Sequence, residues 1–258
     1  MKIELDNIYN MDCLEGMKYI PDGSVDAIIC DLPYGTTANK WDSVIPFDKL
    51  WEQYKRIRKP HAPILLFGSE PFSTNLRMSN MKEFRYDWIW EKSRVGGFVN
   101  AKNKPMKNFE IVSAFCQYPA GHESMLGERR MPYYPQGLVK CNKVCHDTKR
   151  VGQAITVRPT ESGAYVQEYT NYPTAILKFS SEVEGFHPTQ KPVDLLRYLV
   201  LTYTNAGDPV LDNCIGSGTT AIACIREHRH FIGFEMDKVY YKKSIQRINN
   251  EKTVLRLF

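Results

Sequence analysis

The segment Val25-Asp-Ala-Ile-Ile-Cys-Asp-Leu-Pro-Tyr34 is an almost unbroken apolar run that stops at an acid, a proline and an aromatic residue. Such a run is typical of a strand that is buried on both faces of a parallel sheet. A strand of this kind delivers its polar groups at its C-terminal end. We therefore expect the functional site at Asp31 and the residues that follow it.

The end of this strand brings together three different chemical groups. Pro33 keeps Leu32 out of the helical region and donates no hydrogen bond, so the chain leaves the sheet extended with the Leu32 carbonyl unpaired. Asp31 and this carbonyl can both accept N–H bonds from an exocyclic amino group, while Tyr34 stacks on the face of a flat ring. Taken alone, the same residues also fit a plain strand end with a capping acid and a turn proline.

Length and composition limit the class of protein. The chain has 258 residues, of which 43% are hydrophobic, which is enough for one large domain or one domain with an insert. Its first residues lack the apolar core of a signal peptide, and no run of about eighteen apolar residues is present, so we expect a cytoplasmic protein without a membrane partner. The seven cysteines lack a disulfide-type spacing. Cys141, Cys145 and His146 supply too few ligands for structural zinc, so no metal site is predicted.

Positive charge is concentrated in the middle of the chain. From Lys92 to Arg158 there are twelve Lys and Arg against four Asp and Glu, a local charge of +8. The net charge is +5, so the rest of the chain carries 5 − 8 = −3. A concentrated basic segment is the electrostatic footprint of a polyanionic partner, although charge runs are more often solvated surface.

Hydrophobic periodicity predicts alternating strands and helices, which favours a mostly parallel, doubly wound sheet. Besides the central strand, we expect strands at 7–10, 63–68, 84–90, 111–116, 175–179, 209–212 and 231–235, and helices at 13–20, 47–59, 69–79, 193–204 and from the 213–220 turn to about 229. The periodicity fades between Tyr118 and Tyr172. That interval is too long for an ordinary connection, so it is interpreted as an inserted functional unit.

A second motif, Asp212-Asn-Cys-Ile-Gly-Ser-Gly-Thr-Thr220, lies between a predicted strand and a helix. Gly216 and Gly218 permit a tight turn and the close approach of a ligand to backbone N–H groups. Glu235 ends the next strand, where it can accept hydrogen bonds from ribose hydroxyls. The unit indicates an adenosine-containing ligand, with a purely structural turn as the alternative.

Three motifs in this order resemble the amino-group DNA methyltransferases of the β arrangement, which use S-adenosyl-L-methionine: Asp31 to Tyr34, His187-Pro-Thr-Gln-Lys-Pro192, and 212–220. The resemblance covers nearly the whole chain and is weakest from Tyr118 to Tyr172, the target recognition region of that family. It implies an α/β, doubly wound, mostly parallel Rossmann-like methyltransferase sheet with an inserted target-recognition segment. The implied parts are a catalytic half with the target-base pocket (1–118), the insert (119–174) and a cofactor-binding half (175–258).

The resemblance also implies roles for individual residues. A flipped base would be held by the catalytic residues Asp31, Leu32, Pro33 and Tyr34. The cofactor would be bound by Asp12, Cys13, Asp31, Thr189, Lys191, Asp212, Gly216, Ser217, Gly218, Thr219 and Glu235. Two positions depart from the family pattern. Leu32 replaces a proline but keeps the carbonyl, and Asn213-Cys214 replaces Pro-Phe, which removes an aromatic wall of the cofactor pocket.

The implied reaction is methyl transfer from S-adenosyl-L-methionine to the amino nitrogen of adenine in double-stranded DNA. Adenine is favoured because in that family an acid at the position of Asp31 usually accompanies adenine and a serine accompanies cytosine; the N4 of cytosine is the alternative. A nicotinamide-dependent dehydrogenase and a catalytically silent DNA-binding module are more remote alternatives. DNA contacts are expected from Lys140, Lys143, Lys149 and Arg150. A homodimer and a cognate restriction endonuclease are left open as partners.

Overall fold

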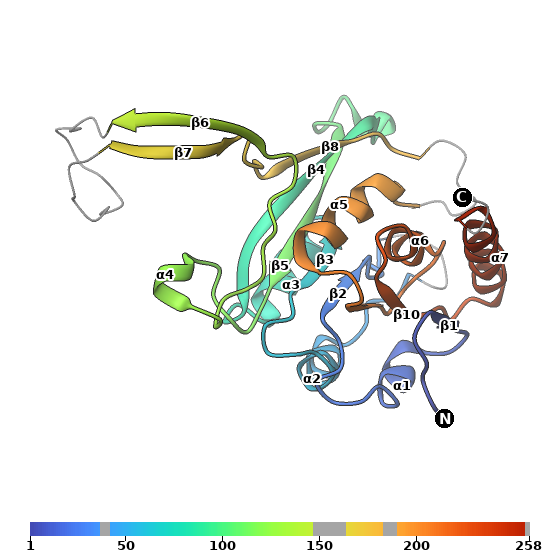
Figure 1. Ribbon diagram of the computed structural model, residues 1–258. Coiled ribbons are helices and arrows are strands. Elements are labelled where there is room, and N and C mark those ends of the chain that lie inside the picture. The colour runs from blue at the N-terminus through green and yellow to red at the C-terminus, as the bar shows by residue number, and fades with distance from the viewer. Residues whose placement is uncertain (37–41, 147–163, 183–189, 256–258) are drawn as a thin grey trace. The chain divides into compact units, whose positions relative to one another are not determined.

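The computed structural model describes residues 1–36, 42–146, 164–182 and 190–255. The chain forms two compact units. The first consists of Met1–Tyr134 with Ala175–Phe258, and the second is Pro135–Thr174. Figure 1 shows the large sheet and its helices in the first unit and a two-stranded hairpin in the second.

The first unit is built on an eight-stranded sheet with the order β1-β10-β9-β2-β3-β5-β4-β8. Its strands are β1 (Asn7–Tyr9), β2 (Ala27–Cys30), β3 (Ile64–Gly68), β4 (Phe84–Gly96), β5 (Lys107–Phe115), β8 (Ile176–Phe179), β9 (Pro209–Asp212) and β10 (His230–Phe234). β5 pairs antiparallel with both of its neighbours, and the other pairs are parallel. The predicted α/β, mostly parallel sheet is confirmed.

Helices cover both faces of this sheet. They are α1 (Cys13–Met17), α2 (Phe47–Ile57) and α3 (Phe72–Ser79) on one face, and α5 (Val193–Tyr203), α6 (Thr219–Arg226) and α7 (Lys238–Leu255) on the other. A short α4 (Glu123–Leu126) lies in the connection after β5. None of the helices in the described part of the chain is long and apolar enough to cross a membrane.

β2 is buried on both sides, as its apolar sequence predicts. Ala27 and Ile29 belong to the core cluster that contains α5 and α6, whereas Ile28 and Cys30 belong to the cluster that contains α1, α2 and α3. Successive side chains of a strand point to opposite faces, so a strand covered on both sides needs apolar residues at every position. This alternation explains why the run stays apolar until Asp31.

Several element boundaries differ from the predicted ones. The helix predicted at 69–79 begins at Phe72, after Pro71, and the Glu70 carboxylate accepts hydrogen bonds from the Thr74 N–H and hydroxyl (3.0 and 2.6 Å). β4 ends at Gly96, well beyond its predicted end, and β5 begins at Lys107, before its predicted start. Both strands are longer than predicted because they pair with each other along this polar stretch. α6 ends at Arg226 rather than near 229, and His228 just beyond it has a φ of 58°.

The compact second unit begins later than the predicted boundary at 119. Residues 119–134 belong to the first unit, where Met131 is buried in the core. The Tyr133 ring stacks on Trp88 with ring centroids 6.3 Å apart, and the Tyr134 N–H donates to the Thr202 carbonyl (2.7 Å). These isolated apolar residues in a polar, proline-containing stretch give no periodic signal, which is why the sequence did not mark them as core.

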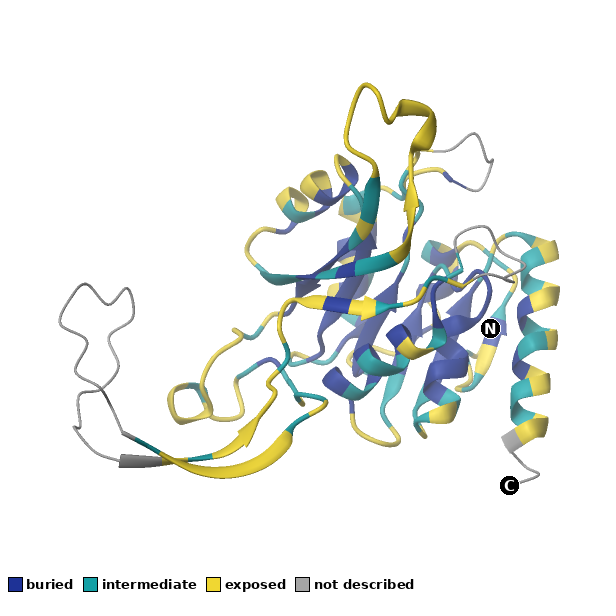
Figure 2. Ribbon diagram, turned by 90° about the horizontal axis from the view of Figure 1, so that it is seen from above, coloured by how far each residue is buried: buried dark blue, intermediate teal, exposed yellow. Residues whose placement is uncertain are grey.

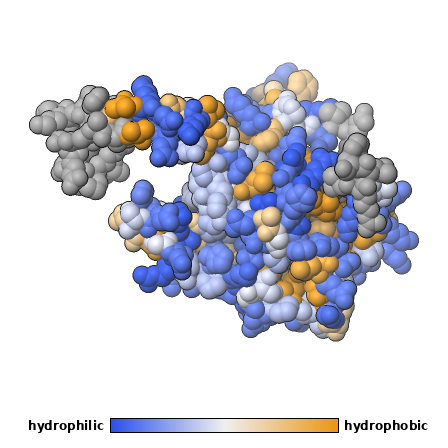
Figure 3. Space-filling model, viewed as in Figure 1, coloured by the Kyte–Doolittle hydropathy of each residue, from blue (hydrophilic) through white to orange (hydrophobic). Residues whose placement is uncertain are grey.

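The second unit is an antiparallel hairpin of β6 (Val139–His146) and β7 (Ala164–Thr170), which the sequence did not predict as strands. Apolar side chains interrupt its hydrophilic surface (Figure 3), and Val139, Val144 and Val166 are exposed. Because neither strand has a buried face, the pattern of alternating apolar residues is absent. In the described residues no group of three or more His, Cys, Asp or Glu is placed to hold a metal ion.

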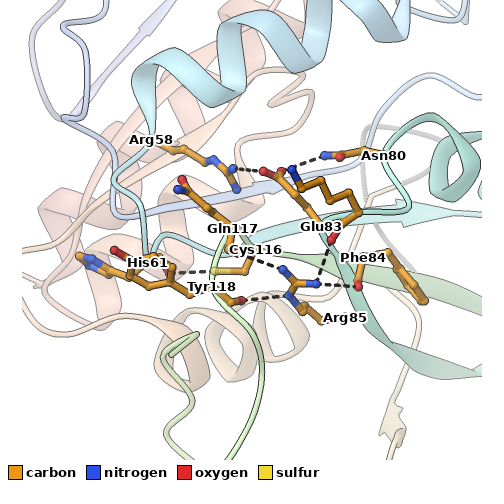
Figure 4. A network of polar contacts seen from close by, with 10 residues as sticks. Arg58, His61, Asn80, Glu83, Phe84, Arg85, Cys116, Gln117 and Tyr118 are labelled. Atoms are coloured by element: carbon orange, nitrogen blue, oxygen red, sulfur yellow. Dashed lines mark hydrogen bonds and ion pairs between the residues drawn. The ribbon is translucent and has the colours of Figure 1, made fainter. Parts of the chain in front are cut away.

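A buried polar network fixes the start of β4 against the segment that follows α2 (Figure 4). Arg58 pairs with Glu83 at 2.7 Å, and the side chains are 2% and 12% exposed. The second Glu83 oxygen accepts from the Asn80 amide (2.9 Å). Arg85 donates to the Tyr118 carbonyl (2.9 Å), which ties the exit of β5 to the start of β4. The network therefore holds the start of β4 and the exit of β5 together at one end of the β4–β5 pair.

Candidate active site

The two sequence motifs meet at the carboxyl edge of the sheet. β2 pairs in parallel with β9, so Asp31, just after β2, and Asp212, at the end of β9, emerge side by side. A cavity of about 330 Å³ lies at this edge. That volume falls in the range of small-molecule sites, about 300 to 1,000 Å³. Among the predicted site residues, the cavity is lined by Asp12, Cys13, Asp31, Leu32, Pro33, Tyr34, Lys191, Asp212, Gly216, Ser217, Thr219 and Glu235.

Asp31 is held by two donors from different parts of the chain. Its Oδ1 accepts a hydrogen bond from the Tyr34 hydroxyl (2.5 Å), and its Oδ2 forms an ion pair with the Lys191 ammonium. Burial raises the pKa of Asp31, and the Lys191 ammonium opposes part of that rise. An ionised carboxylate has about four acceptor sites, so the two bonds leave capacity for an amino group.

Glu110 is a site residue that sequence reasoning missed. It lies on β5 next to Ile111, which pairs with Gly68 at the end of β3, and it lines the cavity. Its Oε1 pairs with the Lys92 ammonium, and its Oε2 lies 3.3 Å from Lys191 Nζ. Burial alone would raise the Glu110 pKa, but the two ammonium groups bring it below its usual value. An acid inside the apolar run of β5 was the available signal.

Lys191 was predicted as a cofactor ligand, and its ammonium is found between Asp31 and Glu110. Its side chain is only 8% exposed. Burial works against the charged form, but the two carboxylates raise the Lys191 pKa above its usual value. The lysine therefore stays charged, and it joins the segment before α5 to the strand end that carries Asp31.

The loop after Asp31 is fixed by local contacts. The Tyr34 ring packs on Phe72, with ring centroids 5.0 Å apart and a 31° angle between the rings. The Asp42 carboxylate accepts from the Gly35 and Thr36 N–H groups at 2.8 and 2.9 Å. Leu32 is buried, and it lies beyond Cys30, the last residue of β2 that pairs with β3. These contacts keep the acid, the carbonyl and the ring at the same end of the cavity.

The glycine turn adopts the backbone conformation that its sequence predicts. Gly216 and Gly218 have φ values of 50° and 79°, in the left-handed region that favours glycine. A Cβ at Gly218 would also lie 3.3 Å from the side chains of Ser244 and Ile248 on α7. Glu235 accepts from the Gly216 N–H (3.0 Å), and burial raises its pKa. A contact of Glu235 with ribose stays a prediction.

Asp212 is buried beneath this turn. Its Oδ2 accepts from the Thr220 hydroxyl (2.6 Å) and its Oδ1 from the Cys214 N–H (3.1 Å). Burial raises its pKa to about 6. On the other side of the turn, Arg247 of α7 donates to the Ser217 carbonyl and the Thr219 hydroxyl, both at 3.0 Å. Arg247 is a second residue that the sequence did not indicate.

The remaining predicted cofactor residues form the far wall of the cavity. Asp12 caps α1 by accepting the Glu15 N–H (3.1 Å). Asn213 takes the place of the expected proline, with its amide nitrogen 3.6 Å from the Cys13 sulfur and its oxygen accepting from the Tyr54 hydroxyl. The cavity lacks an aromatic ring at Cys214 but is lined by the rings of Phe234 and Tyr240. Thr189 lies outside the described residues.

Two of the four predicted DNA-binding residues can be located. Lys140 and Lys143 lie on β6 of the second unit and are exposed. Lys149 and Arg150 lie outside the described residues. A contact of these side chains with DNA therefore stays a prediction.

Comparison with known proteins gives consistent matches. The family model described as DNA methylase matches residues 25–247. The Type II methyltransferase M.HpaI of Haemophilus parainfluenzae is 24% identical over 255 residues, 93% of this chain and 73% of that protein. The Type II methyltransferase M.BglII of Bacillus subtilis is 27% identical over 268 residues, 97% of this chain and 71% of that protein. The crystal structure of the M1.HpyAVI–SAM complex has the same fold, with a TM-score of 0.59 and 23% identity over 93% of this chain and 98% of that one.

Proposed function

This chain belongs to the N6/N4 family of DNA methylases, and from that premise we propose that it methylates the exocyclic amino nitrogen of adenine in double-stranded DNA. Methyl transfer is the reaction of the family, and S-adenosyl-L-methionine is its cofactor. The observation that carries the proposal is that the Asp31-Leu-Pro-Tyr34 strand end and the Gly216 turn line one cavity. A donor site and an acceptor site for the same methyl group need this proximity.

The residues at one end of the cavity fit the cofactor. The glycine turn carries no side chain at Gly216 and Gly218, so a ligand can approach its backbone closely. Two carboxylates, the buried Asp212 and the half-buried Glu235, line the wall beside it. We assign Glu235 to the ribose hydroxyls, and Asp212 to the ammonium of the methionine end. S-adenosyl-L-methionine supplies a methyl group on a positively charged sulfur when it is bound.

The residues at the other end fit an amino group that is being methylated. Asp31 and the Leu32 carbonyl accept its N–H bonds, which turns the nitrogen lone pair toward the cofactor end. The Tyr34 hydroxyl and the Lys191 ammonium hold the Asp31 carboxylate in this orientation. Such pre-organisation contributes through positioning and electrostatics and needs no covalent enzyme intermediate.

Methylation leaves one proton in excess on the amino nitrogen. The nitrogen would gain a bond to the methyl carbon as the methyl–sulfur bond breaks and the sulfur keeps that electron pair, and it must then lose an N–H proton to become the neutral N-methylated amine. Asp31 is the group that accepts that N–H bond in our proposal, and burial raises its pKa. We therefore assign the proton to Asp31, from which it passes to solvent when the product leaves.

Adenine is the proposed base because Asp31 is an acid. In the family resemblance an acid at this position accompanies adenine and a serine accompanies cytosine, and the family includes both N6 and N4 enzymes. Mass spectrometry of nucleosides from DNA methylated by the pure protein tests the assignment. N6-methyladenine is expected. N4-methylcytosine in its place would reverse the choice of base and leave the methyl transfer standing.

We assign DNA recognition to the second unit, Pro135–Thr174, with Lys140, Lys143, Lys149 and Arg150 binding phosphates. The relatives are named Type II methyltransferases, which supports a place in a restriction–modification system. Neutralising the four residues together should weaken binding to all duplexes. It should also flatten the slope of log K against log salt by roughly 0.9 for each phosphate that is no longer bound. An unchanged slope would move the recognition role elsewhere. A homodimer and a cognate endonuclease stay predictions.

A further inference from the structure

The β4–β5 hairpin extends beyond the carboxyl edge of the sheet. β3 ends at Gly68, which pairs with Ile111, whereas β5 begins at Lys107 and its partner strand runs on to Gly96. We call residues 94–106, which connect the two strands, the hairpin tip. Figure 2 shows the tip as exposed, and Figure 1 shows it projecting past the strands of the sheet.

The hairpin tip presents apolar side chains to solvent. Phe98 is 81% exposed and Val99 is 94% exposed, on a single 3-10 turn that follows Gly97 with its φ of 92°. Val95 and Met106 beside them are about half exposed. Several large apolar residues gathered at one exposed point mark an interaction site more than scattered single ones do.

The charge of the hairpin tip identifies the kind of partner. Its sequence contains Arg94, Lys102 and Lys104 and no acid, a local charge of +3. All three are exposed, and none forms an ion pair with another residue that the structure describes. Positive charge around an apolar point fits a polyanion with a stacked apolar interior, which is the chemistry of duplex DNA.

The hairpin tip is anchored close to the base end of the cavity. Glu110, which lines the cavity, lies on β5 three residues from Lys107, and the Lys107 ammonium bonds the Ser69 hydroxyl after β3. An extended strand advances about 3.4 Å per residue, so the tip, which starts four residues from Glu110, lies about 14 Å from it and reaches further. The major groove of B-DNA is about 8.5 Å deep, so an element of this reach can enter the duplex beside a base that occupies the cavity.

We propose that Phe98 and Val99 form a wedge that enters the duplex beside the extruded base and fills the space it leaves, while Arg94, Lys102 and Lys104 contact the flanking phosphates. The inference rests on the proposed function and adds the element that opens the duplex. An enzyme that acts on a base must take it out of the stack, and apolar side chains inserted between base steps serve that purpose. The wedge lowers the energy of the open duplex and takes no part in the methyl transfer itself.

The test compares a duplex that the wild-type protein methylates with the same duplex in which the target base faces an abasic site. The Phe98→Ala/Val99→Ala double variant should lose about tenfold or more in kcat/KM on the paired duplex, because opening then lacks the wedge. On the abasic-opposed duplex, where no base pair has to be broken, the loss should stay within about twofold. The matched control is Val254→Ala, an exposed valine on α7, with no loss on either substrate.

Equal losses on the two substrates, or no loss on the paired duplex, would overturn the wedge. A second readout is independent of methyl transfer: 2-aminopurine at the target position gains fluorescence when wild-type protein unstacks it, and the double variant should abolish most of this gain. If the wild-type protein methylated no DNA, the proposed function would fail, and the fluorescence of 2-aminopurine placed in a duplex that the protein binds would still decide the wedge. An equal fluorescence gain in both proteins would reject it.

The binding of phosphates by the tip is tested separately. Changing Arg94, Lys102 and Lys104 to Gln should flatten the slope of log K against log salt by roughly 0.9 for each phosphate that is no longer bound, without altering the ratio of activities on the two duplexes. Changing the exposed Lys2, Lys18 and Lys55 to Gln provides a control with the same change in net charge. If both triple variants showed the same slope, the basic residues of the tip would have no specific contact with DNA.

Discussion

The Lys191 ammonium forms a buried ion pair with the Asp31 carboxylate, although 160 residues of sequence separate the two. The pair joins the first motif of the chain to the segment that precedes α5. Removing the lysine leaves Asp31, whose side chain is 25% exposed, without its opposite charge, whereas removing Asp31 leaves the lysine paired with Glu110 at 3.3 Å. The ionisation of Asp31, the acid that we propose to be catalytic, therefore depends on a residue 160 positions further along the sequence.

Asp31→Asn should abolish methyl transfer and leave cofactor binding intact. The amide keeps the size of the side chain, but it cannot accept the proton and offers only one acceptor atom to the amino group. We expect kcat to fall by about 100-fold or more, the range seen for a group that handles a proton. Single-turnover transfer of a labelled methyl group measures the rate, and calorimetry with S-adenosyl-L-methionine measures binding. A variant that kept more than about a tenth of the rate would contradict this role.

Lys191→Gln and Glu110→Gln should move the acid limb of the pH–rate profile in opposite directions. In the proposed mechanism activity requires ionised Asp31, so the rate should fall as the pH drops through the pKa of that group. Removing the Lys191 ammonium takes away the charge that opposes the burial effect, so the limb should shift to higher pH. Removing Glu110 takes away a like charge that raises the Asp31 pKa, so the limb should shift to lower pH.

The groups facing Asp31 that contribute to this profile come from several elements. They are Tyr34, Lys191, Glu110 with its partner Lys92, and Asp212. A purely structural role for Lys191 and Glu110 would lower the rate in both variants without opposite shifts. Profiles of kcat/KM against pH, measured at constant ionic strength, distinguish opposite shifts of the acid limb from a uniform loss of rate.

Cofactor affinity should decrease in acid because of Asp212. Burial raises its pKa to about 6, so the carboxylate that we assign to the cofactor ammonium is protonated below that pH. One pH unit below the pKa, about a tenth of the carboxylate remains ionised, so the Kd should rise about tenfold between neutral pH and pH 5. Calorimetry over this range should show the change in wild type and a flat response in Asp212→Asn. A similar slope in both proteins would exclude Asp212.

The same group affects folding with a defined sign. An unfolded aspartate has a pKa of about 3.9, and that of Asp212 is about 6 in the folded chain. Folding therefore favours the protonated form, and this contribution to stability is present below the unfolded pKa and lost as the pH rises through the folded one. Urea unfolding of Asp212→Asn should lack that component of the pH dependence.

Glu83→Ala should be among the most destabilising single changes outside the cavity. It leaves Arg58, whose side chain is 2% exposed, without its carboxylate partner. Breaking a buried pair in this way costs about 3 to 5 kcal/mol of unfolding free energy. The matched control is Glu123→Ala, which breaks a pair with Arg130 in which the side chains are 70% and 38% exposed. That change should cost less than about 1 kcal/mol in the same urea titration.

The sequence predicted those parts of the site that lie in continuous motifs. Asp31 follows an apolar strand, and Gly216 and Gly218 occupy positive φ values that their residue type allows. Both signals are local, since they depend on neighbours in the chain. The sheet class followed from the alternation of strands and helices, and the family resemblance is confirmed by the match over residues 25–247.

The parts that the sequence did not predict depend on spatial neighbours. Glu110 becomes a site residue only because β5 lies beside β3, an adjacency that no periodicity encodes. Arg247 reaches the glycine turn from a helix thirty residues further along the chain. β6 and β7 have no buried face, so they lack the alternating pattern that identifies strands. Glu110 and Arg247 could be assigned to the site only once the arrangement of strands and helices in space was known.

The pairing of β2 with β9 also bears on how the chain is made. Ala27 lies opposite Val210, a separation of 210 − 27 = 183 residues. At about 5 to 20 residues per second, a ribosome needs on the order of 10 to 40 s to synthesise that interval. During this time the most apolar strand of the sheet has β3 on one side and no partner on the other. The nascent chain therefore carries an open, aggregation-prone strand edge until β9 has been synthesised.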